Sequence, residues 1–152
     1  METINERVRD DVRAQLSSDP RLPYPDEIAV DYDGYTLTLQ GTVGSFAQQR
    51  AAMADARRTP GVEDVFDDLQ VRVLGDDRRK DAEIRGAALE RLIWDAELSD
   101  QYLDVAVHHG WVTLKGEVGH QYQSDTAYER VATLRGVTGV TNEVKVIEGR
   151  RP

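Results

Sequence analysis

The residue types that most often perform catalysis or bind metals are present but do not form a recognisable site. The three histidines of this 152-residue chain are His108, His109 and His120. Neighbouring residues of a strand point to opposite faces, so we expect His108 and His109 not to share a metal ion. A serine nucleophile needs a histidine base and an orienting acid, and neither Ser45 nor Ser124 lies in a nucleophile-elbow sequence. The chain has no cysteine, and we predict no enzymatic activity, no metal site and no cofactor.

Acidic residues gather in two short stretches, at 26–33 and 63–68. Hard cations such as Ca²⁺ need several converging oxygen ligands. Neither stretch has the Asp-x-Asp-x-Asp-Gly spacing and the closing glutamate of an EF-hand loop. We interpret both stretches as solvated surface, with a cation-sensing surface as the weaker alternative.

One basic segment stands out against this acidic background. Its centre is three consecutive residues, Arg78, Arg79 and Lys80, and the basic patch continues through Arg85 and Arg91 on the following predicted helix. Together with Trp94, this segment has the chemistry to contact an anionic lipid headgroup or an acidic partner segment. Acidic residues interleave with it, and Asp81 and Arg85 have the spacing of an ordinary helical ion pair. The sequence therefore favours a structural role, with Trp94 packed into the core at the end of a helix.

The spacing of apolar residues predicts the order of elements in the first half. Apolar residues recur at every fourth position of a predicted helix: Ile4, Val8, Val12 and Leu16. A predicted strand at 28–32, a turn and a return strand at 37–43 form a β-hairpin. A second helix opens with a capping sequence at Ser45–Gln48 and runs to Arg58, and a strand follows at 65–73.

The second half of the chain repeats the first. Residues 110–119 match residues 35–44 at a shift of 75, with Thr, Leu, two Gly and Val in register. Upstream of a one-residue gap, matched positions such as Val8 and Ile84 are 76 residues apart. Self-similarity at a fixed spacing indicates duplication of a structural unit. The sequence therefore predicts two tandem modules, each with the element order αββαβ.

Each module is predicted to be an α+β unit. Its three-stranded mixed sheet carries both helices on one face, because only this arrangement buries the apolar sides of all five elements. The modules are expected to span 1–75 and 76–149, with a polar boundary at 75–77 and a short tail at 150–152.

The uncovered face of each predicted sheet is available for other contacts. Most residues with outward parity are polar, and the apolar exceptions are Phe66, Trp111 and Ile147. These residues are candidates for an inter-domain contact, for a partner site, or for scattered surface positions without a role. On the inward side, Gly41 and Gly116 are expected to admit a neighbouring helix or to mark a bulge.

The composition argues against several classes of function. The net charge is −9, from 28 acidic and 19 basic residues, which disfavours nucleic-acid binding and general adsorption to anionic membranes. The N-terminus lacks the apolar core of a signal peptide, and no apolar run approaches the ~18 residues of a membrane span. Taken as it stands, the chain is expected to be soluble and cytoplasmic.

The second repeat carries a spaced pattern of residues that is specific enough to compare with known families. The pattern reads Trp94-Asp95-x-x-Leu98, Val105-x-Val107, Gly110-x-Val112-Thr113-Leu114-x-Gly116-x-Val118, Ala127 and Gly136-Val137-x-x-Val140-x-Asn142-x-Val144-x-Val146. It resembles a BON domain (bacterial OsmY and nodulation), and the whole chain resembles a tandem pair of such domains. The first repeat departs from the pattern at its turn glycine Gly34, in its loop prolines, and at Asp67 in place of Asn142.

The resemblance implies a non-enzymatic protein that binds phospholipid or a membrane surface, in connection with envelope or osmotic stress. The candidates for lipid or partner binding are Arg78, Arg79, Lys80, Trp94, Trp111, Phe66 and Ile147. The alternative is a protein-interaction or scaffold module that acts through the open sheet faces, with self-association included.

Overall fold

The protein consists of two compact units. The structure, a computed structural model, describes residues 3–75 and 78–148. The first unit comprises Met1–Arg72 and the second comprises Val73–Pro152. Each unit is therefore a separate folded body with its own core.

Some predicted features fall outside the described residues. These are the boundary residues Asp76 and Asp77 and the tail at 150–152. Among the residues that the structure does describe, no helix combines the length and the apolar character that a membrane span requires.

The first unit has the predicted order of elements. They are helix α1 (Ile4–Ser18), the short 3-10 helix η1 (Pro25–Glu27), strands β1 (Ile28–Tyr32) and β2 (Thr36–Val43), helix α2 (Phe46–Arg58) and strand β3 (Asp64–Val71). Strand β2 lies at the centre of the sheet, antiparallel to β1 and parallel to β3. The connection from β2 to β3 runs through α2, as a parallel pair requires a crossover.

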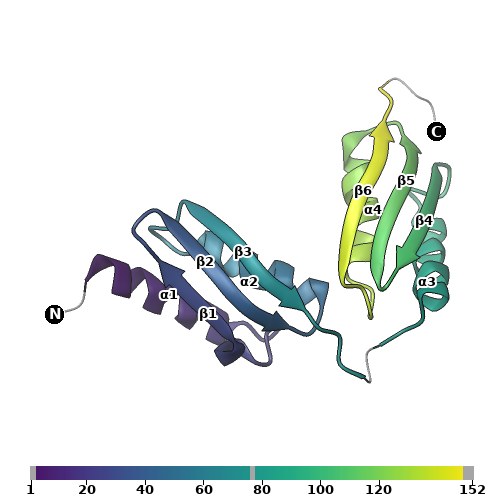
Figure 1. The fold of residues 1–152 in the computed structure, drawn as a ribbon. Coiled ribbons are helices and arrows are strands. Elements are labelled where there is room, and N and C mark those ends of the chain that lie inside the picture. The colour runs from purple at the N-terminus through teal and green to yellow at the C-terminus, as the bar shows by residue number, and fades with distance from the viewer. Residues whose placement is uncertain (1–2, 76–77, 149–152) are drawn as a thin grey trace. The chain divides into compact units, whose positions relative to one another are not determined.

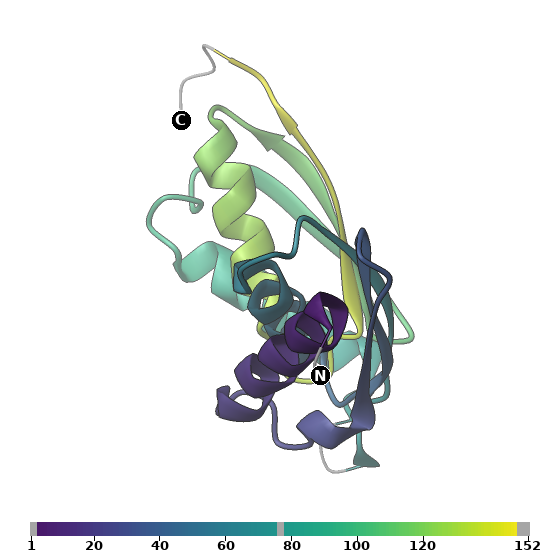
Figure 2. The same cartoon turned by 90° about the vertical axis from the view of Figure 1, so that its left-hand side faces the viewer.

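The second unit repeats this topology. Its elements are helix α3 (Asp81–Trp94), strands β4 (Tyr102–His108) and β5 (Trp111–Val118), helix α4 (Gln121–Ala132) and strand β6 (Gly139–Val146). Strand β5 is central, antiparallel to β4 and parallel to β6. In each unit both helices cover one face of the sheet and leave the other face open (Figures 1 and 2). The predicted pair of αββαβ modules is confirmed.

The predicted apolar stripe of α1 forms part of the first core, with one exception. Val8, Val12 and Leu16 are buried, and each contributes roughly 1.5–3 kcal/mol relative to an exposed side chain. Ile4 is exposed, because the first turn of α1 extends past the end of the sheet (Figure 1). The prediction that Ile4 belongs to the buried stripe was wrong.

The central strand of each sheet supplies the other half of each core. Its alternating apolar residues are buried under the helices: Leu37, Leu39 and Val43 in β2, and Val112, Leu114 and Val118 in β5. Apart from Gly41 and Gly116, which have inward parity, the residues between them face the open side and are exposed or half-buried. This alternation is the period-2 pattern that a sheet covered on one face imposes on its sequence.

The two hairpins turn differently, and the difference lies where Gly34 of the first repeat departs from the pattern of the second. In the second unit the turn residues His109 and Gly110 both have positive φ, 49° and 80°, which is the conformation of a two-residue type I′ turn. In the first unit the last paired residues are Tyr32 and Leu37. The longer turn between them is held by the Asp33 carboxylate, which accepts two backbone N–H bonds of 2.8 and 2.7 Å.

Gly41 and Gly116 occupy equivalent positions in the two central strands. Their φ values are +130° and +138°, a region that side chains other than glycine rarely adopt. A Cβ atom would overlap the backbone oxygen of Glu27 at the first position and of Tyr102 at the second. The close neighbour is therefore the backbone at the start of the adjoining edge strand, where Glu27 ends the 3-10 helix η1 and Tyr102 begins β4. It is not one of the α-helices, which were the first of the two predicted alternatives.

Candidate functional site

An open hollow lies in the second unit where α3 and α4 end. Five residues line it: Arg91, Trp94, Asp95, Arg130 and Thr133. Its volume is about 340 Å³, at the lower end of the ~300–1,000 Å³ that small-ligand sites occupy. We call this surface the α3–α4 hollow.

The tryptophan of the hollow points away from the core. Trp94 is 79% exposed and its neighbour Ile93 is 66% exposed. The buried stripe of α3 passes through Ile84, Ala88 and Leu92, and at about 100° per residue the next two positions turn off this face. The prediction that Trp94 packs into the core was wrong.

Two arginines of the hollow connect the ends of the helices. Arg91 Nη1 donates to the backbone oxygen of Arg130 at 3.0 Å and to Thr133 Oγ1 at 2.8 Å. Arg130 Nε donates to Asp95 Oδ2 at 2.8 Å. Among the described residues these hydrogen bonds use only Nη1 of Arg91 and Nε of Arg130. The other N–H groups of both guanidinium groups can therefore contact solvent or a bound anion.

The hollow combines positive and negative charge. The hydrogen bond from Arg130, together with a backbone N–H bond, lowers the pKa of Asp95 below its usual range. Asp95 is therefore ionised at neutral pH and offsets the charge of Arg130. Arg91 has no carboxylate partner among the described residues, and it supplies the uncompensated positive charge of the hollow.

The predicted basic segment 78–80 lies at the other end of α3. The helix begins at Asp81 and ends at Trp94, and its length at ~1.5 Å per residue is roughly 20 Å. Arg79 Nη1 reaches the backbone oxygen of Arg135 at 3.5 Å. The structure therefore places Trp94 beside Arg91 of the predicted basic patch and beside Arg130, which the sequence analysis did not select. It holds Trp94 apart from residues 78–80 at the other end of α3.

The predicted ion pair between Asp81 and Arg85 is not formed. Arg85 instead donates to Val105 O at 2.7 Å and to Asp104 Oδ1 at 3.0 Å, on strand β4. The Asp81 carboxylate accepts the two backbone N–H groups of the turn 109–110, at 3.0 and 3.1 Å. These bonds lower the pKa of Asp81 and tie the start of α3 to the β4–β5 hairpin.

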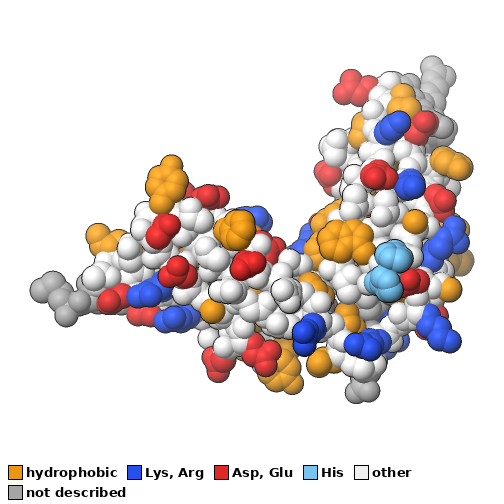
Figure 3. Space-filling model, viewed as in Figure 1, with side chains coloured by type: hydrophobic (Ala, Val, Ile, Leu, Met, Phe, Trp, Pro, Cys, Tyr) orange, Lys and Arg blue, Asp and Glu red, His pale blue; other side chains and the backbone are white. Residues whose placement is uncertain are grey.

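The open sheet face of the second unit presents Trp111. Its ring lies over Gly139 of the neighbouring strand, where any Cβ atom would overlap the ring. The indole Nε1 donates to Thr141 Oγ1 at 2.8 Å, and the side chain remains 47% exposed. Figure 3 shows hydrophobic side chains beside the pale-blue histidines on this face. Trp111 is therefore an exposed aromatic side chain that is already fixed in one orientation.

The other two apolar candidates are also exposed. Phe66 lies on β3, on the open face of the first unit. Ile147 directly follows the last residue of β6, whereas Trp111 pairs with Gly139, the first residue of that strand. Ile147 and Trp111 therefore lie at opposite ends of the second sheet.

The histidines differ from the prediction in one respect. The rings of His108 and His109 are neighbours, with centroids 4.2 Å apart, because the positive φ of His109 breaks the strand alternation on which the prediction relied. His120 stacks on Tyr122 instead. Within the described residues no three His, Cys, Asp or Glu side chains converge as metal ligands.

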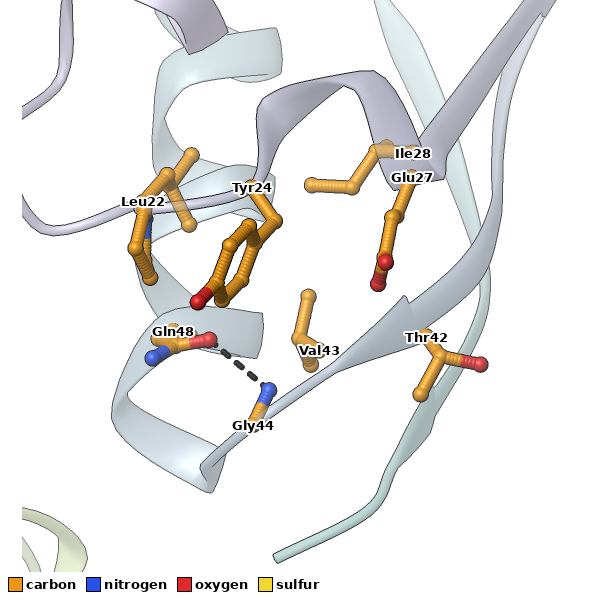
Figure 4. Close-up of a pocket in the computed structure, with 9 residues that line it drawn as sticks. Leu22, Tyr24, Glu27, Ile28, Thr42, Val43, Gly44 and Gln48 are labelled. Carbon is orange, nitrogen blue, oxygen red and sulfur yellow. Dashed lines mark hydrogen bonds between the residues drawn. The ribbon is translucent and has the colours of Figure 1, made fainter. Parts of the chain in front are cut away.

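A small cavity in the first unit lies between the loop after α1 and the start of α2 (Figure 4). Leu22, Ile28 and Val43 form its apolar side, and Gln48 accepts the N–H of Gly44 at 2.7 Å across its mouth. Its volume of about 20 Å³ is close to the space that one water molecule needs. The cavity is too small for an organic ligand.

The first unit also contains a charged cluster that the sequence analysis missed. Asp55 of α2 is 0% exposed and lies beside Asp19, which follows α1. Arg21 binds Asp19 through Nε at 2.9 Å and Nη2 at 2.7 Å. Its Nη2 also lies 3.6 Å from Asp55 Oδ1, and Arg58 pairs with the same oxygen. The available signal was a carboxylate within the alanine-rich buried face of α2.

The environments of the two carboxyl groups move their pKa values in opposite directions. Burial, and then the neighbouring Asp19, raise the pKa of Asp55 to about 6. The hydrogen bonds from Arg21 hold the pKa of Asp19 well below its usual range. Two adjacent carboxyl groups in one site commonly separate in this way, because both do not ionise easily together.

Comparisons with known proteins agree with the duplicated fold. The model of the BON domain matches residues 5–73 and 80–148, one match in each unit. The chain is 31% identical over 128 residues to the osmotically-inducible protein Y of Escherichia coli strain K12, in an alignment that covers 78% of this chain. The same alignment covers 61% of that relative, so this chain matches only about three fifths of its length.

Two solved structures of CdsD, a structural protein of the type III secretion system of Chlamydia trachomatis, are also similar. One, of its C-terminal domain, has 16% identity and a TM-score of 0.38, and covers 93% of this chain and 66% of that chain. The other has 16% identity and a TM-score of 0.40, with coverage of 95% and 64%.

Proposed function

We propose that this chain, which belongs to the BON domain family, is a non-catalytic protein of the osmotic stress response that binds phospholipid surfaces through its α3–α4 hollow. The family match to both units and the printed name of the relative in Escherichia coli support the stress association. The site itself is proposed on the geometry of the second unit alone.

One observation carries the proposal: the large exposed side chain of Trp94 lies next to two guanidinium groups. Ile93 and Trp94 are the last two residues of α3, and both side chains are exposed to solvent. Tryptophan is a side chain that favours the interface between lipid and water. Arg91 and Arg130 line the hollow beside Trp94, and guanidinium groups bind phosphate oxygens well. The hollow therefore offers an apolar anchor and a phosphate contact at one place.

The charge of the rest of the chain sets conditions on such binding. With a net charge of −9, the protein as a whole is repelled by an anionic membrane. Attraction depends on local contacts at the hollow, where Asp95 already offsets Arg130. We expect modest affinity that rests on insertion of Trp94 and falls as salt screens the arginines.

The two tryptophans allow the proposal to be tested by fluorescence. Trp94 and Trp111 are the only indoles, so Trp111→Phe leaves Trp94 as the single probe and Trp94→Phe leaves Trp111. With phosphatidylglycerol vesicles at low salt, we expect a blue shift of emission in the first variant and none in the second. A shift confined to the variant that retains Trp111 would assign contact to the open sheet face instead.

Vesicle co-sedimentation gives an independent test. Trp94→Ala should reduce the bound fraction several-fold, because the apolar anchor is lost. Ile4→Ala is the matched control, since Ile4 is another exposed apolar side chain at a helix end and its loss should leave binding unchanged. Equal binding of the two variants, or no binding of the unaltered chain at low salt, would contradict the lipid proposal.

The orientation of Trp111 supports a second candidate, a protein-interaction role of the open sheet faces. Its ring is fixed over Gly139 and bonded to Thr141, so little side-chain freedom is lost when a partner covers it. Light scattering of the full chain tests the self-associating form of this role. An oligomer that dissociates in Trp111→Ala would support it, and a monomer at all concentrations would exclude self-association.

A further inference from the structure

We propose that Asp19 and Asp55 form a proton-binding site in the first unit, where the two carboxyl groups share one proton and this proton couples the stability of the unit to pH. The site is independent of the lipid proposal, because it lies in the other unit and needs no membrane.

Within the part of the chain that the structure describes, one buried oxygen of Asp55 lacks a hydrogen-bond donor. Asp55 Oδ2 is buried and, among the described residues, has no hydrogen-bond partner. Its neighbour Asp19 is also a carboxylate, and ionised carboxylates only accept hydrogen bonds. A buried acceptor without a donor is costly. A proton on Asp55 turns its carboxyl group into a donor toward Asp19 and satisfies both groups with one bond.

The charged groups around the pair stabilise one negative charge more readily than two. Asp19 follows α1, Arg21 lies in the next loop, and Asp55 and Arg58 belong to α2. Arg21 and Arg58 pair with Asp55 at Oδ1, and both side chains extend into solvent, where their charge is screened. Neither arginine donates a hydrogen bond to the buried Oδ2. The proton therefore remains the group that satisfies this oxygen.

The second unit provides an internal comparison at the same junction. Asp95 stands where the first unit has Asp19, and Arg130 stands where it has Asp55, by the repeat shifts of 76 and 75. Asp95 and Arg130 form a direct ion pair of 2.8 Å. One carboxylate meets one guanidinium there, so the junction needs no shared proton.

The pKa values give the sign of the pH dependence. Burial raises the pKa of Asp55 to about 6, so the folded unit holds more protons than the unfolded chain below that pH. Its folding equilibrium constant should rise by up to about tenfold per pH unit as pH falls from about 6 toward 4, and this gain is lost as pH rises through 6. Asp19, whose pKa is lowered, reverses the trend below its unfolded pKa of ~3.9.

A direct test is a pH titration of the full chain by NMR of the aspartate side-chain carboxyl carbons. We expect the signal of Asp55 to titrate with a midpoint near pH 6, far above the signals of Asp95 and Asp33, whose pKa values are lowered. A midpoint for Asp55 in the ordinary range of ~3.9 would overturn the proposal. This measurement needs no variant, so it holds even where a substitution prevents folding.

Urea unfolding, followed through the amide signals of each unit, shows whether the proton stabilises the fold. Asp55→Asn keeps the shape and places a permanent N–H donor beside Asp19, so it should remove the gain in stability of the first unit between pH 6.5 and 4.5. Asp95→Asn is the matched control and should weaken the second unit without creating such a gain. A slope that persists in Asp55→Asn would assign the pH dependence to other groups and contradict the proposal.

Discussion

Gly41 and Gly116 occupy positions at which the backbone conformation and the nearby chain admit only glycine. Both have positive φ, and at both a Cβ atom would overlap a carbonyl oxygen at the start of the neighbouring edge strand, that of Glu27 directly before β1 or that of Tyr102, the first residue of β4. That oxygen belongs to the backbone and cannot rotate away as a side chain can. Glycine recurs at a spacing of 75 because the same close backbone contact with an edge strand is present in both units.

A first prediction at the residue scale is that Gly116→Ala destabilises the second unit by at least about 2 kcal/mol, because strain at positive φ adds to the overlap with Tyr102. Gly86→Ala is the matched control. Gly86 lies in α3 with nothing near its Cβ position, and alanine there should stabilise by roughly 0.5–1 kcal/mol. Urea unfolding of both variants measures the difference, and a Gly116→Ala variant as stable as the unaltered chain would contradict this explanation.

At the scale of elements, the two helices of the second unit depend on each other at their ends. The last carbonyl groups of a helix lack partners within it. In α4 one of them, that of Arg130, accepts a hydrogen bond from Arg91 of α3, which also binds Thr133 after the helix ends. At the other end of α3, Asp81 binds the β4–β5 turn. The helix is thus attached to its unit at both ends by polar contacts as well as by its buried face.

A second prediction follows at this scale. Arg91→Ala should lower the stability of the second unit by about 1 kcal/mol, the usual net value of such hydrogen bonds, and leave the first unit unchanged. Arg57→Ala in the last turn of α2, where Arg57 is exposed, is a comparable arginine deletion with a smaller expected effect. Urea unfolding resolved by unit measures both changes, and equal losses would show that Arg91 has no special role.

The whole molecule consists of one fold used twice with different chemistry. The cores and sheet registers correspond, whereas the junctions between helices differ: a carboxyl pair in the first unit and an ion pair in the second. The open faces differ too, with Phe66 on one and Trp111 on the other. Duplication has therefore kept the packing and left each unit free to acquire its own surface and its own response to pH.

A third prediction concerns this organisation. Each unit has a separate core, so polypeptides 1–75 and 76–149 should each fold when expressed alone. Their amide NMR spectra, added together, should reproduce most signals of the full chain. Units of this size bury proportionately little surface, and we expect modest stability for each. Loss of dispersed signals from either polypeptide would show that the unit depends on its neighbour.

The sequence by itself determined the architecture of this protein. The period-4 stripe of Val8, Val12 and Leu16, the alternation of Leu37 and Leu39, and their recurrence in the second half identify the elements and their duplication. When one face of a helix or strand is buried, its apolar residues must recur with the period of that element, about 3.6 residues in a helix and two in a strand. Architecture of this kind is readable because it depends on local spacing.

Only the tertiary structure decided which side chains share a site. Trp94 lies beside Arg91 and Arg130 because α3 and α4 end next to each other. Arg85 binds strand β4 and not Asp81, and Asp19 meets Asp55 because the ends of α1 and α2 pack together. These contacts join residues that are far apart in the chain or depend on the direction of a side chain. Neither property leaves a periodic trace in the sequence, since both arise only when the helices and the sheet have packed together.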